Sequence, residues 1–294
     1  MCFMRFLYFD VVIFSLIFSV LFCFLCCVVD SLFGFWIFLE LCGLSIIPSF
    51  FVGSDLNFYN LYGSVLSYII MSGLSSGLLV SGLLISNLYY FVFFGFVVKF
   101  GLFPFMLWVY RVFSVGSWVF IFFLSVVMKF PVLFFCFLYQ VSGLDLVFLD
   151  CWFTLLVCSC LVWLFSLSWE YVWCHISLSS VATLVVACFS SSVEICFFIY
   201  WYYFFWGLCS VIYFVVVSDL GDVKGYNFWF FCVLLLITPV SMPLIYKLSV
   251  CVGIFYSSVY ILFIWVVYSF SEQFFLFKLG GDYFYSSVFN CWLE

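Results

Sequence analysis

The sequence predicts an all-α protein, a polytopic bundle of about ten transmembrane helices, and three observations support this prediction. Hydrophobic residues make up 70% of the 294 residues and charged residues only 7%, too little polar material to cover the surface of a water-soluble domain. Apolar runs of roughly 18–25 residues, the length that crosses a bilayer, follow one another along the chain. The separators between them are short, so we expect one transmembrane domain over residues 1–294.

The order of the apolar runs predicts two blocks of five helices, in residues 1–140 and 141–272, followed by a C-terminal tail at 273–294. The predicted spans are Phe6 to Val29, Leu32 to Val52, Leu61 to Ser86, Leu88 to Tyr110, Val115 to Tyr139, Leu146 to Leu167, Tyr171 to Ser190, Ile195 to Val217, Phe228 to Leu248 and Ser249 to Phe270. Aromatic and β-branched residues favour strands in water, but in lipid such long runs satisfy their backbone hydrogen bonds as helices. The first run is too long for the apolar part of a signal peptide, so we expect it to be a transmembrane helix.

Four ionisable residues lie inside the predicted spans: Glu40, Lys99, Lys129 and Lys247. A charge in a bilayer costs roughly 2.5–3.5 kcal/mol on insertion scales, so an intramembrane ionisable residue indicates a functional site by default. Alternatives remain open for two of them. Glu40 can be a neutral carboxyl hydrogen-bonded to another helix, and Lys247, near the end of its span, can extend its ammonium to the membrane surface.

Glycine and proline accompany each of the lysines and predict interrupted helices. Lys99 precedes Gly101 and Pro104, Lys129 precedes Pro131, and Lys247 follows Pro239 and Pro243. Proline removes a backbone donor and clashes with the preceding turn, and the carbonyls freed by such a break can build ion sites in a membrane. The fourth span of each block is predicted to be broken, and an odd number of helices per block inverts the second copy. We therefore expect two inverted five-helix repeats.

His175 is the only histidine, and both a hydrogen-bonded structural role and a role in proton transfer are open for it. A single histidine excludes haem ligation by a histidine pair. The 16 cysteines include the stretch CFLCC and the pair Cys158 and Cys160, but no matching Cys or His set stands nearby. We interpret them as small apolar residues of helices and expect no metal site.

The composition also bears on origin and partners. Phe, Cys, Trp, Val, Leu and Gly are abundant, and Pro, His and Gln are scarce; the first group can be coded mostly with U and G. This skew is typical of a mitochondrial coding strand, so we expect synthesis inside the organelle. The net charge of −6 and the absence of a basic patch exclude nucleic acid as a partner.

Several motifs resemble those of the mitochondrially encoded NADH dehydrogenase subunit 2 family, an antiporter-like subunit of respiratory complex I. The family pattern K-x-G-x-x-P-F-x-x-W is matched by KFGLFPFMLW, which runs from Lys99 to Trp108, and a second lysine about thirty residues on is matched by Lys129. The stretch LELCGLSIIP around Glu40 and the stretch LSSV at 178–181 are also similar to family motifs. The chain departs from the family in having Met106 after Pro-Phe and Trp173 and Cys174 where a basic residue usually stands, which leaves His175 as the nearby protonatable substitute.

The resemblance implies a multi-pass protein of the mitochondrial inner membrane that translocates protons as part of NADH:ubiquinone oxidoreductase. Its partners would be other membrane-arm subunits and the lipid bilayer, and electron transfer would take place elsewhere, because this chain has no Gly-rich phosphate loop, flavin site or iron–sulfur cysteine set. We expect no cofactor in this chain. The implied proton relay consists of Glu40, Lys99, Lys129, Lys247 and His175. Two further readings remain open: a free-standing cation/proton antiporter, and a structural membrane subunit with paired, inert lysines.

Overall fold

A computed structural model describes residues 9–51, 58–85, 90–138, 144–166, 168–220 and 226–284, and all regular structure in these ranges is helical. The helices are α2 (Phe9–Val28), α3 (Leu32–Ile46), α4 (Phe58–Leu84), α5 (Tyr90–Phe100), α6 (Leu107–Phe113), α7 (Trp118–Ser125), α8 (Phe130–Leu138), α9 (Leu144–Phe165), α10 (Trp169–Ser190), α11 (Val193–Leu220), α12 (Tyr226–Leu234), α13 (Met242–Ile254) and α14 (Val259–Phe284), with 3₁₀ turns η1 (Ile47–Phe51) and η3 (Val127–Lys129). The prediction of an all-α polytopic bundle is confirmed.

The described residues contain eight helical segments that are long and apolar enough to cross a membrane. Two predicted spans are instead broken pairs: α5 with α6, and α12 with α13. Each pair includes a short apolar helix, Tyr90–Phe100 or Met242–Ile254. The eight segments and the two broken pairs together correspond to the ten predicted spans.

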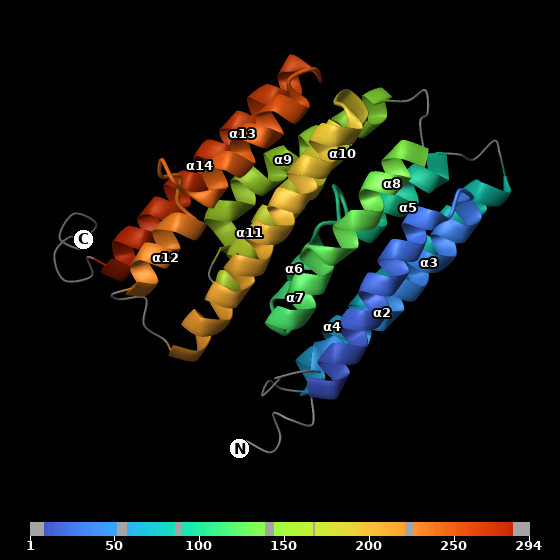
Figure 1. Cartoon of the computed structure of the whole chain (residues 1–294), viewed down its shortest axis with the longest axis horizontal. Helices are drawn as coiled ribbons and strands as arrows, with labels where there is room; N and C mark the ends of the chain where they lie inside the picture. Colours follow the sequence, from blue (N-terminus) through green and yellow to red (C-terminus); the bar gives the residue numbers. More distant parts are fainter. Residues whose placement is uncertain are drawn as a thin grey trace.

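The helices form two adjoining groups, α2–α8 in blue to green and α9–α14 in yellow-green to red (Figure 1). Helix α10 is central: it packs against α8 and α6 of the first group and against α9, α11 and α13 of its own. Every residue of α10 from 172 to 188 is buried. A helix that is apolar and buried all round belongs to the interior of a bundle.

The packing inside the two groups follows the same order. The first helix packs against the second and against the fifth segment, as α2 does with α3 and α8 and as α9 does with α10 and α14. The third helix packs against both parts of the broken fourth span: α4 against α5 and α6, and α11 against α12 and α13. This parallel supports the predicted repeat, and superposition of the two groups about a two-fold axis in the membrane plane stays a prediction.

The two lysines lie on opposite sides of their breaks, in the order that the sequence gives relative to the prolines. Lys99 lies in the last turn of α5, before the first break, whereas Lys247 lies inside α13, after the second. The two lysines therefore lie in corresponding segments of the two groups, but at positions that are not equivalent.

Two predicted boundaries near the C-terminus are wrong. The ninth span does not end at Leu248, because α13 continues to Ile254, and the turn before α14 includes Ser257, whose amide bonds to the carbonyl of Ile254. Helix α14 then runs to Phe284, so the helix passes through residues 273–284 that were predicted as a tail. A helix that begins at Val259 needs about 20 residues to cross a bilayer, which is why it extends beyond the predicted end.

Candidate functional site: a line of buried charges

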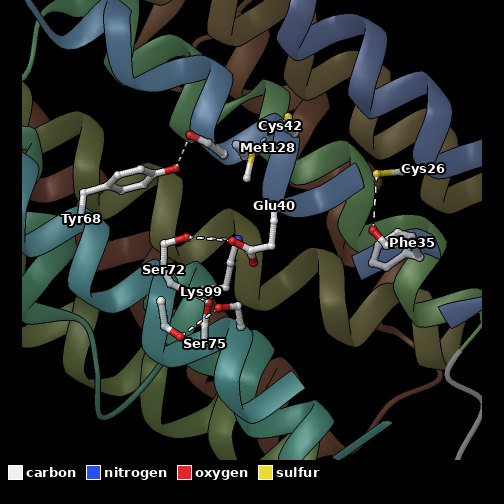
Figure 2. Close-up of polar contacts among 12 residues, drawn as sticks. Cys26, Phe35, Glu40, Cys42, Tyr68, Ser72, Ser75, Lys99 and Met128 are labelled. Carbon is white, nitrogen blue, oxygen red and sulfur yellow. Dashed lines mark hydrogen bonds and ion pairs between the residues drawn. The ribbon is translucent and has the colours of Figure 1, made fainter. Parts of the chain in front are cut away.

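Glu40 and Lys99 form an ion pair in the first group of helices. The Lys99 Nζ atom lies 2.5 Å from Glu40 Oε1, and Ser72 of α4 donates a hydrogen bond of 3.3 Å to the other carboxylate oxygen. Figure 2 shows the three side chains, from α3, α4 and α5, pointing toward one another. Lys99 is buried, with 7% of the residue exposed, while 20% of the Glu40 side chain is exposed. The family resemblance implied that both residues belong to one relay, and the structure brings them together.

The predicted break after Lys99 is present. Helix α5 ends at Phe100, and Gly101 has a φ of 66°, a conformation that glycine adopts without steric cost. Side chains satisfy the freed backbone groups: the Trp108 indole donates to the carbonyl of Val98 over 3.1 Å, and Thr154 of α9 accepts from the amide of Phe103 over 3.1 Å. The break thus fixes Lys99 at a helix end inside the bundle.

Lys129 is the most deeply buried of the three lysines, with 2% exposed. Its ammonium donates to the carbonyl of Ser177 over 2.9 Å and to the hydroxyl of Ser180, and it lies 3.9 Å from the centre of the Tyr203 ring. No carboxylate of the described residues pairs with it. Carbonyl, hydroxyl and aromatic dipoles therefore replace a counter-ion here.

The backbone around Lys129 is interrupted as predicted, but by a different means. Helix α7 ends at Ser125, and Lys129 lies in the 3₁₀ turn η3, where its amide bonds to the carbonyl of Val126 over 3.3 Å. Pro131 follows in the first turn of α8, where a missing N–H costs nothing.

A cavity of about 30 Å³ joins the surroundings of Lys99 and Lys129. Both lysines line it, together with Tyr68, Ser72, Ser125 and Ser177 among its polar residues. A buried cavity needs roughly 10–15 Å³ of such volume to hold one water molecule. The space is therefore large enough for water between the two lysines, and the walls offer it hydrogen-bonding partners.

Lys247 forms a second ion pair, with a carboxylate that the sequence analysis did not identify. Its Nζ lies 3.0 Å from Glu272 Oε1 of α14 and 3.4 Å from the carbonyl of Ser269. Glu272 is 5% exposed. Because Lys247 is buried and paired inside the bundle, the structure favours a partnered lysine over the alternative that its ammonium extends to the membrane surface.

The second break precedes Lys247. Helix α12 ends at Leu234 and α13 begins at Met242, with Pro239 between them and Pro243 in the first turn of α13. The Trp206 indole donates to the carbonyl of Leu234 over 2.7 Å, as Trp108 does at the first break. The Gln273 side chain of α14 accepts a hydrogen bond from the amide of Ile237 and donates one to the carbonyl of Leu235.

Polar side chains occupy the region between Lys129 and the second pair. Tyr246, adjacent to Lys247 in the chain, interacts with the hydroxyls of Thr183 and Ser180, and Ser180 is also a partner of Lys129. The rings of Tyr203 and Tyr246 lie 5.6 Å apart between centroids. These hydroxyls make the surroundings of Lys129 on the side of α13 polar.

His175 lies beside this line rather than in it. Its Nδ1 atom is 2.8 Å from the hydroxyl of Tyr110, and no described side chain bonds to its Nε2 atom. Tyr268 bonds to the backbone carbonyl of His175, not to the ring. The structure thus gives His175 a hydrogen-bonded position between helices, and its predicted part in proton transfer stays a prediction.

Comparison with protein-family models finds no match for this chain, and comparison with curated protein sequences finds none either.

Proposed function

We propose that the chain is a proton-translocating membrane-arm subunit of NADH:ubiquinone oxidoreductase, complex I, in the mitochondrial inner membrane. Its part in the reaction would be transport alone, with electrons passing from NADH to ubiquinone in other subunits. The motif around Lys99 and the composition support the family, and the buried charges support the activity.

One observation carries the proposal: the bundle buries three lysines, a cavity joins the first two, and a carboxylate pairs with the first and with the last. The order is Glu40 with Lys99, then Lys129, then Lys247 with Glu272. An inert structural subunit has little reason to bury Lys129 without a counter-ion, since an unpaired charge is the most costly kind to bury.

The energies suit the proposed transport. At an effective dielectric constant of about 20, two charges 4 Å apart attract by about 4 kcal/mol. Moving one charge across a membrane costs about 2.3 kcal/mol per 100 mV. Opening and closing the Glu40–Lys99 pair therefore changes the stability of the Lys99 ammonium by an amount comparable to the work of moving one proton across an energised membrane.

A proton would move as follows. Separation of Glu40 from Lys99 makes the ammonium unstable, and its proton passes through water in the cavity to Lys129, which accepts it as a neutral amine after releasing its own proton onward. From Lys129 the proton would continue past Ser180 and Tyr246 toward the pair of Lys247 and Glu272, from which it leaves. Closing of the Glu40–Lys99 pair draws in the next proton.

The proposal is tested by the native complex in which the chain migrates. Membranes solubilised in mild detergent are separated by native electrophoresis, the gel is stained for NADH dehydrogenase activity, and the active band is analysed for this chain by mass spectrometry. We expect the chain in the active band. Its recovery only at the size of a free subunit or in an inactive complex contradicts the proposal.

A free-standing cation/proton antiporter is the second candidate, favoured by the presence of both acid–lysine pairs in one chain. Such a protein needs no redox partner. The purified chain in liposomes, with an internal pH-sensitive dye, should then release protons when Na⁺ or K⁺ is added outside. A chain that exchanges no cation alone but migrates with NADH dehydrogenase activity excludes this candidate.

A further inference from the structure

Gln273 connects the second helix break to the second ion pair. Its Oε1 atom accepts a hydrogen bond of 2.9 Å from the amide of Ile237. Its Nε2 atom donates to the carbonyl of Leu235 over 3.3 Å and to Glu272 Oε1 over 3.2 Å. Glu272 Oε1 is the same oxygen that pairs with Lys247.

The chemistry of an amide explains these three bonds. Glutamine carries an acceptor and two donors on one rigid plane, so it can serve a freed N–H and a freed carbonyl at the same time. Without water in the bilayer interior, the backbone groups of a broken helix need such partners. Gln273 is 8% exposed, and two of its three partners, Leu235 and Glu272, are buried while Ile237 is half-buried.

The first break lacks this connection. Thr154 accepts from the amide of Phe103, and its own hydroxyl donates to the carbonyl of Asp150. It makes no bond to Glu40 or Lys99. Thr154 therefore stabilises a break without contacting an ion pair, which makes it a matched control for Gln273.

We infer that Gln273 is a positioning residue that couples the conformation of the 235–241 break to the charge of Glu272. A charged carboxylate accepts a stronger hydrogen bond than a neutral one. The charged Glu272 therefore fixes the orientation of the Gln273 amide, and the amide in turn stabilises the backbone at Leu235 and Ile237. By reciprocity, a movement of the backbone at the break weakens the hydrogen bond from Gln273 to Glu272. The inference rests on the proposed function only for its consequence for pumping, because the coupling itself is a property of the fold.

Hydrogen–deuterium exchange of the chain in its native complex measures how strongly the backbone amides of the 235–241 break are protected. We expect Gln273→Met, which keeps the side-chain length, to speed exchange at the Ile237 amide about fivefold, the equivalent of one hydrogen bond worth about 1 kcal/mol. Exchange in residues 101–106 should stay unchanged. Thr154→Val should speed exchange in residues 101–106 and leave exchange at the Ile237 amide unchanged. If Gln273→Met fails to assemble, Gln273→Asn keeps the amide but shortens the side chain, and the same faster exchange is expected.

A double-mutant cycle measures the coupling. Glu272→Gln removes the charge, so exchange at Ile237 should rise about twofold in the native background and not at all in the Gln273→Met background. Equal effects in both backgrounds overturn the inference, as does unchanged exchange in Gln273→Met.

The number of protons pumped per electron connects the coupling to function. A merely structural role lowers the amount of complex and leaves this ratio unchanged, whereas a positioning role lowers the ratio in assembled Gln273→Met complex. Coupling in the exchange cycle without any pumping by the native complex disproves the proposed function alone. Pumping by the native complex with additive effects in the cycle disproves the role of Gln273 alone.

Discussion

Replacement of Glu40 by glutamine tests the first ion pair with little change in shape. Glu40→Gln keeps the side-chain volume and an oxygen that can accept from Ser72, but removes the charge 2.5 Å from the Lys99 ammonium. The Coulomb attraction lost is about 4 kcal/mol at an effective dielectric constant of about 20. Removing one partner of a buried pair costs about 3–5 kcal/mol in measured cases, which agrees with this value.

A loss of about 4 kcal/mol lowers the equilibrium ratio of Lys99 ammonium to neutral Lys99 amine by a factor of several hundred, since each 1.4 kcal/mol is tenfold. We expect proton pumping by the assembled complex to fall at least about tenfold, the smaller factor reflecting other slow steps. Pumping is measured in proteoliposomes as quenching of a pH-sensitive dye, normalised to NADH oxidation. The amount of assembled complex should stay within about twofold of the native amount, because the side-chain volume is kept and Lys99 without its partner can release its proton instead of remaining a buried charge.

Glu194→Gln is the matched control, because it makes the same substitution at an exposed acid in the first turn of α11. It should leave pumping per electron unchanged. Native pumping by assembled Glu40→Gln complex would refute the role of the pair in transport. An equal loss in both variants would indicate that the complex responds to lost negative charge in general.

Three further outcomes follow from the geometry. Lys129→Met should assemble normally but interrupt pumping, measured as protons per electron, and full pumping in this variant would remove the central lysine from the path. Lys247→Met should lower the thermal stability of the complex more than the double replacement of Lys247 and Glu272 by Met, because the single change leaves an unpaired carboxylate worth about 3–5 kcal/mol; equal melting temperatures would contradict the pairing. Gly101→Ala should destabilise the first break by about 1–3 kcal/mol, since its Cβ would meet Val109 at 2.2 Å and its φ is 66°, and an unchanged melting temperature would show that the break relaxes.

The helix breaks could be predicted from the sequence because their causes are local. A proline lacks an amide and clashes with the turn before it, whatever surrounds it. Pro104 and Pro239 lie between the helices of a broken pair, and Pro131 and Pro243 lie in the first turn of a new helix. The side chains that satisfy these breaks, Thr154 and Gln273 among them, come from other helices and give no local signal.

Glu272 was not predicted as a site residue because the ends of the last span were misplaced. The predicted last span began at Ser249 and ended at Phe270, so the carboxylate fell outside the membrane. The turn before α14 contains Ser257 and Ser258, which bond to backbone groups at the end of α13 and the start of α14. Serines there are a usable signal, since they favour turns and helix starts. A span begun after them would have included Glu272.

The position of Lys129 decides how the charges can work together. At each end of the line a carboxylate balances a lysine, so adding a proton to Lys129 places one uncompensated positive charge in the interior. The dipoles of Ser177, Ser180 and Tyr203 stabilise this charge less than a carboxylate would. Two lysines near it repel it unless their carboxylates stay close. Opening the Glu40–Lys99 pair therefore passes a proton to Lys129, and the Glu272 carboxylate in the pair that stays closed attracts it onward, which gives transfer through Lys129 a direction without requiring Lys129 itself to move.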